Sequence, residues 1–402
     1  MSLIKSASTI GGSSVISQLI GAFTILFISY RYGMSAVGNY ALMLGVILIG
    51  AQIALYGSHL LLPKVEDDEF DIAIVFTLLQ SWGISALYIY IVRLYFDLPF
   101  VATYVLTASY SLMIVSENVF LRYKFFNMLA LQRISVTLVV FIAALCSWKF
   151  EYLYDVWAAF HLTLMCVWLY KYIDFKSFRA RAFSPKEQVS FIIKHWQHLS
   201  RIGSAEVIAN ASLQLPTILI NHWFSPLVAG YFAVVNRFCL SPVLIMGQSV
   251  RNYTFSKWSE DFRNKHFNVK EYQQVRVLLF CLSICVVIGI YFVYPLIIEH
   301  FLSKQWVDSI ATSRMMLPYV FVMLAFVPLT VVELIFGSPN YFLRIQCEQL
   351  AIVILTFIIV PLIYEDYALS LLMFSILTAI RYFMIYMNIN RRVTKLVEQG
   401  FN

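Results

Sequence analysis

The chain has 402 residues, of which 60% are hydrophobic and only 13% are charged, and its formal net charge is +7. Soluble domains are roughly 45–50% apolar and about 25% charged, so a soluble fold could not cover this much apolar surface. A bilayer removes that requirement, because each helical span needs about 20 mostly apolar residues. The composition therefore excludes an ordinary soluble protein and predicts an all-α membrane protein.

Apolar stretches predict twelve transmembrane helices with short loops between them. The first stretch has no small-residue cleavage site, so we expect a span there and not a signal peptide. Prolines at span edges, such as Pro63 and Pro226, cost little because a helix terminus already has N–H groups without helical partners. The predicted spans are 13–31, 39–61, 72–95, 100–119, 128–148, 155–172, 201–222, 227–250, 275–297, 315–336, 342–363 and 367–389.

The distribution of Lys and Arg predicts the orientation. Basic residues are retained on the cytoplasmic side of a membrane. If the N-terminus is cytoplasmic, most of the 29 Lys and Arg residues fall in cytoplasmic segments, and the outer segments hold only Arg31, Arg93, Lys149, Lys304 and Arg314. We therefore expect both termini in the cytoplasm. The basic excess is explained by topology and by contact with anionic lipid headgroups, so nucleic acid is not an expected partner.

The longest loop, 173–200, is cytoplasmic on this topology. It divides the chain into an N-terminal six-helix bundle over 1–172 and a C-terminal six-helix bundle over 201–402. Within the loop, Ser184 followed by Glu187 has the spacing of a helix capping box, which predicts a short helix outside the membrane.

The two halves show a weak internal repeat. A shift of 192 residues places 28–41 on 220–233, so that a span end, a turn and a small-x-Gly-x-aromatic-Ala start occur in both. The same shift places Gln18 on Asn210, which gives both first helices an amide at one depth. Parallel repeats of this kind are a transporter architecture. Chance similarity between apolar segments is the alternative.

Motifs for catalysis or metal binding are not evident. The sequence contains no P-loop, HExxH or GxSxG motif, so nothing indicates an enzyme or an ATP-driven pump. The acidic run 66–71 lacks the spacing of a calcium loop and is expected to be a solvated charge cluster. The six cysteines lie in or beside apolar segments and show no disulfide or zinc pattern.

Short motifs resemble a transporter family. The run Tyr32-Gly-Met-Ser-Ala-Val-Gly-Asn-Tyr-Ala-Leu resembles the "LGxxxFGxYxL" turn of polysaccharide flippases, and the run 223–238 resembles the equivalent turn of their second half. The segment 302–306 is similar to a family "FGxxW" position, while Val37 and Ser225 depart from the pattern. The chain thus resembles the Wzx-type flippases for polysaccharide (O-antigen) repeat units, within the multidrug/oligosaccharidyl-lipid/polysaccharide exporter superfamily.

The resemblance implies a fold and a function. It implies two six-helix bundles around a central cavity, as in the MATE and flippase transporters, which rock to give alternating access. The implied substrate is an undecaprenyl-diphosphate-linked oligosaccharide, moved across the bacterial inner membrane for O-antigen or capsule synthesis. A proton or sodium gradient is the candidate driving force, and no other cofactor is implied. The polymerase and the chain-length regulator of that pathway are candidate partners.

Two other functions remain open. An integral-membrane polysaccharide polymerase or ligase would need a long outer loop with catalytic residues, whereas the long loops here are predicted to be cytoplasmic. A drug or cation antiporter of the same superfamily would carry cations. Arginines within the predicted spans and a basic excess favour an anionic substrate instead.

Polar residues inside predicted spans are the candidate substrate contacts. Charged groups at the bilayer centre are costly and are functional candidates by default, and arginine can donate two parallel hydrogen bonds to a phosphate. Residues spaced by three or four, such as Glu206, Asn210 and Gln214, or Gln52 and Tyr56 with His59, share one helix face, as would Arg237 and Ser241. Structural pairing and hydrogen bonding between helices are the alternative. The predicted substrate-binding residues are Arg237, Arg381, Asn210, Gln214, Gln18, Gln52 and Gln248.

Three carboxylates are candidates for ion coupling: Glu117, Glu206 and Glu333. Desolvation near the cytoplasmic end of a span can raise a carboxyl pKa enough for proton exchange. Pairing with a nearby arginine, such as Arg122 for Glu117, is the alternative. Glu206 is the strongest candidate because it begins the polar face of the seventh predicted span.

Overall fold

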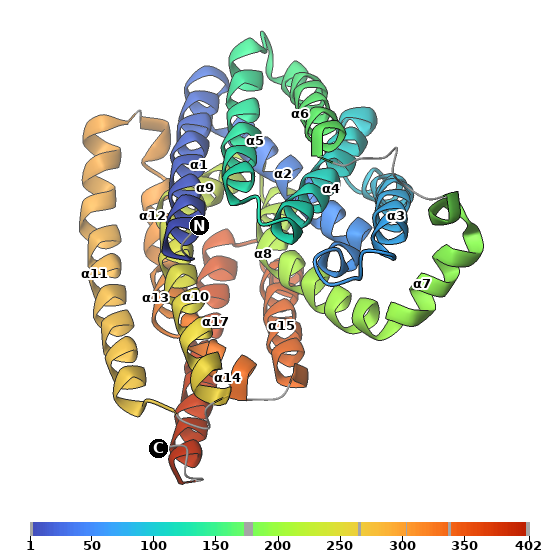
Figure 1. Ribbon diagram of the computed structural model, residues 1–402. Helices are drawn as coiled ribbons and strands as arrows, with labels where there is room; N and C mark the ends of the chain where they lie inside the picture. The colour runs from blue at the N-terminus through green and yellow to red at the C-terminus, as the bar shows by residue number, and fades with distance from the viewer. Residues whose placement is uncertain (1–2, 173–179, 264–266, 303, 337–338, 399–402) are drawn as a thin grey trace. The chain divides into compact units, whose positions relative to one another are not determined.

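A computed structural model describes residues 3–172, 180–263, 267–302, 304–336 and 339–398 (Figure 1). Within these ranges the chain is helical and contains no strand, so the predicted all-α fold class is confirmed. A helix, or a series of shorter helices, covers each of the twelve predicted spans.

Among the described residues, fewer helices than the predicted twelve meet the length and hydropathy expected of a span. In the described residues, ten helices are long and apolar enough to cross a membrane, or eleven if a bent pair at Lys304–Met315 and Leu317–Ala325 counts as one. The two members of this pair meet at 55°, because the helix breaks before Leu317-Pro318. The predicted seventh span corresponds to α8 (Ser204–Trp223), whose polar face keeps it outside those ten.

Contacts between residues divide the chain into two compact units. Unit 1 comprises Met1–Tyr32 and Asn39–Ile218, and unit 2 comprises Gly33–Gly38 and Leu219–Asn402. Unit 1 therefore includes most of α8, and the start of α2 is grouped with unit 2. The organisation into bundles 1–172 and 201–402 around a central cavity stays a prediction.

Unit 1 contains six long helices that run from the N-terminus to residue 172, followed by a short surface helix and α8. Helix α1 packs along α5, and α4 packs along α6 (Figure 1). The elements before α8 are α1 (Leu3–Tyr32), α2 (Met34–Leu55), η1 (Ser58–Leu61), α3 (Phe70–Val92), α4 (Phe100–Arg122), α5 (Phe126–Cys146), α6 (Phe150–Tyr172), η3 (Ala180–Phe183), α7 (Pro185–His198) and η4 (Leu199–Gly203).

Helix starts follow local chemistry only in part. Helix α4 starts directly after Pro99, whose extended backbone cannot continue a preceding helix. Helix α7 starts at Pro185, as the sequence predicts, and proline suits this first position. The predicted capping box is wrong in detail, because the Ser184 side chain makes no capping hydrogen bond.

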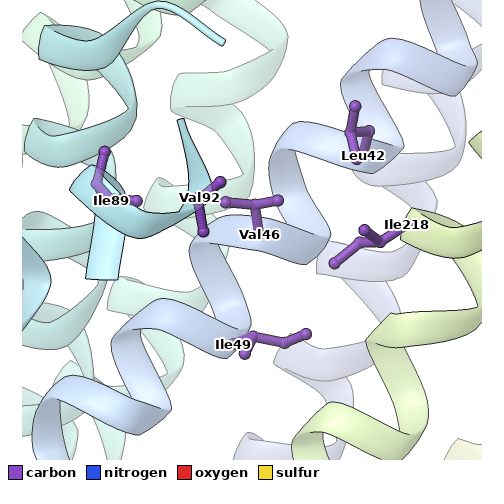
Figure 2. Close-up of a cluster of buried hydrophobic side chains, with 6 residues drawn as sticks. All are labelled: Leu42, Val46, Ile49, Ile89, Val92 and Ile218. Carbon is purple, nitrogen blue, oxygen red and sulfur yellow. The ribbon is translucent and has the colours of Figure 1, made fainter. Parts of the chain in front are cut away.

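A buried aliphatic cluster joins three helices of unit 1 (Figure 2). Leu42, Val46 and Ile49 project from successive turns of α2, with spacings of four and three that place them on one face. They meet α3 near its C-terminal end and one residue of α8, Ile218. This cluster fixes α2 between α3 and α8, and so positions the polar groups further along α2.

Unit 2 contains longer helices interrupted by irregular turns. Two turns, η5 and η8, are π-helical, and Pro318, Pro328 and Pro361 begin short helical pieces. Its elements are α9 (Pro226–Val235), η5 (Asn236–Leu240), α10 (Ser241–Arg263), α11 (Val269–Phe301), η6 (Lys304–Trp306), α12 (Ser309–Met315), α13 (Leu317–Ala325), η7 (Val327–Thr330), α14 (Val331–Phe336), α15 (Pro339–Ile354), η8 (Leu355–Ile359), α16 (Val360–Ile363) and α17 (Tyr367–Glu398).

Helix α9 begins with a well-formed cap. Ser225 has an extended backbone, its hydroxyl accepts a hydrogen bond from the Val228 N–H at 3.2 Å, and Pro226 occupies the first turn. This departure from the family turn, which has glycine at the serine position, therefore has a local physical reason.

The start of α2 and the start of α9 cross at glycines inside unit 2. A Cβ at Gly38 would lie 1.8 Å from the Pro226 carbonyl oxygen, and a Cβ at Gly230 would lie 2.4 Å from the Met34 carbonyl oxygen. The contact is reciprocal, because the 192-residue shift places Met34 on Pro226 and Gly38 on Gly230. Equivalent residues exchanging the same contact indicate a local two-fold relation, which supports the internal repeat.

Candidate functional site

Polar side chains connect α2 and α8 within unit 1. The Gln52 amide donates a hydrogen bond to the Glu206 carboxylate at 3.4 Å, and the Tyr56 and Ser204 hydroxyls are 2.8 Å apart. Gln52 is buried, whereas Glu206 is exposed. The structure thus brings together two of the predicted residues, one from the substrate set and one from the ion-coupling set.

A tight backbone contact holds these hydrogen-bonded side chains of α2 and α8 in place. Helix α2 ends at Leu55, and Tyr56 and Gly57 have φ values of 41° and 77°. A Cβ at Gly203, in the π-helical turn before α8, would lie only 2.3 Å from the Tyr56 carbonyl oxygen. Because α2 has ended, the predicted helical face Gln52–Tyr56–His59 is wrong, but the Tyr56 hydroxyl still reaches α8.

The polar face of α8 is helical throughout, as predicted. Glu206, Asn210 and Gln214 lie within one uninterrupted helix at four-residue spacing, so they share a face. Gln18 lies in α1 and is half-buried. The role of these amides in binding stays a prediction.

Glu117 pairs with a different arginine from the one considered from sequence. Arg133 Nε, on α5, lies 3.3 Å from Glu117 Oε1, on α4, and the same guanidinium donates to Ser14 Oγ at 3.3 Å. Arg122 instead pairs with Asp67 and donates to the Leu62 carbonyl oxygen at 2.8 Å. Glu117 therefore belongs to a salt bridge that joins α4 to α5 and extends to α1.

In unit 2, Arg381 of α17 forms a salt bridge with Glu348 of α15. Glu348 also accepts a hydrogen bond from Arg344 at 2.8 Å. The side chain of Arg381 is 18% exposed, and that of Arg344 is 71% exposed. Tyr341 is a further electrostatic neighbour of Arg381. Two arginines thus share one carboxylate, which leaves a local positive excess.

Glu333 lies at a polar cavity in unit 2. Arg392 Nε, on α17, is 2.9 Å from Glu333 Oε1, and Arg392 also donates to the Phe336 carbonyl oxygen at 3.0 Å. The Glu333 side chain is only 7% exposed. A cavity of about 470 Å³ lies here, and its lining consists of Glu333, Phe336, Tyr341, Asn388, Arg391, Arg392 and Leu396.

The other two predicted residues of unit 2 lie apart from this cavity's lining. Arg237 is half-buried in the π-helical turn η5, where Ser241 Oγ donates to the Asn236 carbonyl oxygen at 3.0 Å, five residues back. Residues four apart still lie close to one side of a π-helical turn, so the shared face of Arg237 and Ser241 stays a prediction. Gln248 is exposed and donates to Asn252 at 2.9 Å.

Outside the spans, charged groups of unit 1 meet around Glu69. A hydrogen bond from Lys194 holds the pKa of the Glu69 carboxyl below its usual value of 4.5, and His195, 3.5 Å away, acts in the same direction. The same pairing raises the pKa of Lys194. The acidic run 66–71 therefore pairs with basic residues of the chain, and the described residues contain no cluster suited to a metal.

The geometry as a whole is that of a helical membrane protein with charged groups inside both units, and known structures have the same chain path. One is an inward-facing MATE multidrug transporter of the MOP superfamily, with 11% identity, a TM-score of 0.61, and coverage of 100% of this chain and 97% of that one. This chain has the fold of MATE transporters. Its predicted MATE-like fold is thereby confirmed.

Two further structures show the range of proteins with the MATE fold. The MATE multidrug transporter DinF-BH, in complex with rhodamine 6G, has 12% identity and a TM-score of 0.65, with coverage of 96% of both chains. A MOP superfamily transporter from Pyrococcus furiosus, whose binding pocket has a reversed polarity that suggests a different function, has 12% identity and a TM-score of 0.63, with coverage of 98% and 96%. No protein-family profile and no curated protein sequence matches the chain.

Sequence reasoning missed three residues that the MATE fold brings to the predicted sites. Glu348 and Arg392 pair with the predicted residues Arg381 and Glu333, and Arg133 pairs with Glu117. A signal was present for Glu348, because Arg344 and Glu348 are four residues apart and a carboxylate on a spanning helix needs a partner. Nothing in the sequence indicated which helix would supply that partner.

Proposed function

We propose that this protein is a flippase that moves an undecaprenyl-diphosphate-linked oligosaccharide across the bacterial inner membrane by alternating access. The MATE-type fold supports transport, since the structural neighbours are transporters. The substrate follows from the charge balance of unit 2, which carries the proposal.

The polar network of unit 2 is positive. Around Glu348 and the cavity beside Glu333, the arginines are Arg344, Arg381, Arg391 and Arg392, against those two glutamates. A diphosphate presents several acceptor oxygens, which arginine binds through paired hydrogen bonds. A cavity of about 470 Å³ is within the usual size of small-ligand sites and could hold a phosphate and part of a sugar. An anionic headgroup therefore fits this network better than a cation does.

The pocket of reversed polarity in the Pyrococcus furiosus transporter supports this interpretation. It is a precedent for a MATE-type fold whose pocket charge differs from that of its relatives. In the bacterial context that we propose, both termini lie in the cytoplasm, and the polymerase and chain-length regulator of the polysaccharide pathway are candidate partners.

A drug or cation antiporter is the second candidate. Two observations favour it: the structural neighbour DinF-BH has been described in complex with rhodamine 6G, and Glu206 of unit 1 is an exposed carboxylate that an organic cation could approach. Glu206 and the arginine network lie in different units of the chain, so separate substitutions can test the two candidates.

One reconstitution distinguishes the two functions. The purified protein is placed in proteoliposomes that contain either a fluorescent undecaprenyl-diphosphate oligosaccharide, with flipping followed by dithionite quenching, or a proton gradient and rhodamine 6G. We expect lipid flipping and no dye accumulation, and we expect Arg381→Ala to reduce flipping by about tenfold or more. The control is Arg314→Ala, because Arg314 of α12 stacks on Tyr291, 5.1 Å from the ring centroid, and takes no part in the network. Accumulation of the dye without lipid flipping would instead establish the antiporter.

A further inference from the structure

Helix α7 (Pro185–His198) is a surface helix that connects directly to a span. It follows the turn η3 (Ala180–Phe183), and it continues into α8 through the π-helical turn η4 (Leu199–Gly203). All of these residues, together with α3 (Phe70–Val92), belong to unit 1. In Figure 1, α7 is the light green helix that lies beside α3.

The inner face of α7 packs against the start of α3. The Gln188 amide donates to the Ile72 carbonyl oxygen at 3.4 Å, and the Phe191 ring lies 5.5 Å from the Phe76 ring, centroid to centroid. Further along α7, His195 lies 3.5 Å from Glu69. From Gln188 to His195, a rise of about 10 Å along α7, the partners lie between Glu69, just before α3, and Phe76, and they do not advance along α3 in step with α7.

The C-terminal end of α7 lies near the segment that follows α2. His198 has Gly57 and Lys64 as its neighbours, and both follow the end of α2. Burial and the charge of Lys64 lower the pKa of His198, in agreement with a packed position at this contact. Helix α7 therefore runs across the end of α2 and the start of α3.

The outer face of α7 is apolar and exposed. Val189, Ile193 and Trp196 are 53%, 71% and 60% exposed, and their spacing of four and three residues places them on one side, away from Phe191. Lys186 projects beside this stripe. Monomeric soluble surfaces rarely show a contiguous apolar stripe of this kind, so the stripe requires a cover.

We propose that α7 is an interfacial amphipathic helix whose stripe Val189–Ile193–Trp196 inserts into the lipid leaflet at the ends of α2 and α3, with anionic headgroups bound by Lys186 and Arg201. The depth of α7 supplies the first argument, because the level where spanning helices start is the level of the headgroups. Tryptophan prefers this level, and a helix with an apolar face bordered by basic residues lies in the interface plane.

The basic residues beside the apolar stripe favour anionic lipids. Lys186, Gln197 and Arg201 follow the stripe on the same flank at helical spacing, and all three are exposed. A basic residue near an anionic surface strengthens binding by about fivefold. The lipid charge at this leaflet therefore influences how firmly α7 is held, and through η4 it influences the start of α8.

Site-directed spin labelling of the full chain tests the proposal. The six cysteines are replaced by alanine, the melting temperature is checked against the parent protein, and single labels are placed in nanodiscs of phosphatidylcholine and phosphatidylglycerol. Labels at Ile193 and Trp196 are expected to be accessible to oxygen and protected from a water-soluble nickel reagent, as a label at Leu79 on the lipid-facing side of α3 should be. Labels at Glu187, on the polar side of α7, and at Glu66 should show the reverse.

Two outcomes would overturn the proposal. Free access of the nickel reagent at Ile193 and Trp196 would show that the stripe faces water. Low access of both reagents would show that protein covers it, for instance a second copy of the chain. Lipid charge is tested in the same samples: without phosphatidylglycerol, the immersed fraction at Ile193 should fall several-fold, and Lys186→Gln should reduce the difference between the two lipids. An immersed fraction independent of lipid charge would remove the anionic headgroups from the proposal.

Discussion

Unit 1 and unit 2 differ in the elements that carry their ion pairs. In unit 1, Arg122 pairs with Asp67 and Lys194 pairs with Glu69, and both carboxylates belong to the acidic segment between η1 and α3. Glu117 and Arg133, which join α4 to α5, are the exception. In unit 2, carboxylates on α14 and α15 pair with arginines of α17, a helix apolar enough to span a membrane. The pair of Lys257 on α10 with Glu271, in the first turn of α11, is the exception there.

This difference has an energetic consequence. An exposed ion pair in water contributes little, because solvent and salt screen it and two long side chains must be ordered. A pair removed from water is costly to break, because the remaining charge stays desolvated. The pairs of the acidic segment in unit 1 can thus tie surface segments together at little cost, whereas Glu333 and Arg381 of unit 2, whose side chains are 7% and 18% exposed, would be costly to leave without a partner.

The largest effect is expected where the starts of α2 and α9 cross within unit 2, because the glycines there leave no space for a Cβ. Gly230→Ala would place a Cβ 2.4 Å from the Met34 carbonyl oxygen, and because that neighbour is backbone, a helix must shift. We expect a loss of about 3 kcal/mol in stability, or failure to fold, as for severe overpacking. Thermal unfolding in detergent measures this.

Gly289→Ala on α11 is the matched control. No atom lies within 4 Å of a Cβ at this position, and alanine favours the helix. It should leave the melting temperature unchanged or raise it slightly. In unit 1, Gly203→Ala should behave like Gly230→Ala, because its Cβ would lie 2.3 Å from the Tyr56 carbonyl oxygen. Equal melting temperatures for all three variants would show that neither crossing is tight.

The next largest effect concerns the shared carboxylate of unit 2. Arg381→Ala removes the less exposed of the two arginines on Glu348 and should reduce lipid flipping by about tenfold or more, since an arginine bound to a charged headgroup contributes about 1.5–3 kcal/mol. Arg344→Ala should reduce it less, because the Arg344 side chain is 71% exposed. Flipping rates at matched protein levels measure both, and equal effects would show that Arg381 has no special place in the network.

The sequence predicts helices well and their partners poorly. Apolar runs about 20 residues long located a helix, or a series of shorter helices, at each predicted span, and four-residue spacing correctly placed Glu206, Asn210 and Gln214 on one face of α8. Periodicity describes a single helix, so it could not show that Arg392 would meet Glu333. That contact depends on how helices pack, which is a property of the whole fold.

Irregular turns were the second source of error. The early end of α2 before Tyr56 changes which side chains share a face. Hydropathy hardly changes at such turns, because the side chains remain apolar on both sides of them. The break before Pro318 was visible as a proline within or near a predicted span, but its 55° bend was not.

Neutralising one carboxylate in each unit should give different results. Glu333→Gln leaves Arg392, whose side chain is 41% exposed, without its counter-charge, and we expect a loss of about 1–2 kcal/mol, below the cost for a fully buried pair. Glu206→Gln retains an oxygen acceptor for the Gln52 amide, so stability should change by less than about 0.5 kcal/mol. If Glu206 couples transport to protons, the dependence of flipping on pH should flatten in this variant.

The double variant Glu333→Gln with Arg392→Gln is the control for this pair. It removes both charges and should recover most of the stability that the single change loses. Stability and pH dependence that are the same in Glu206→Gln and Glu333→Gln would contradict a difference between the two units.

The smallest effect is expected at the surface of unit 1, where Lys194 and His195 depress the pKa of Glu69 below 4.5. A carboxyl with a lowered folded-state pKa stabilises the protein above its usual pKa, and this contribution disappears as the pH falls through the folded-state value. The melting temperature of Glu69→Gln should therefore lie slightly below that of the parent at pH 6, and the difference should shrink as the pH falls below 4.5, disappear below the folded-state pKa, and be small in 1 M salt. Glu66→Gln, in the same acidic run, is the control with a weaker effect, because Glu66 acts on Lys194 only through its charge. A difference that persists at low pH would mean that Glu69 stabilises the start of α3 by some means other than its ion pair.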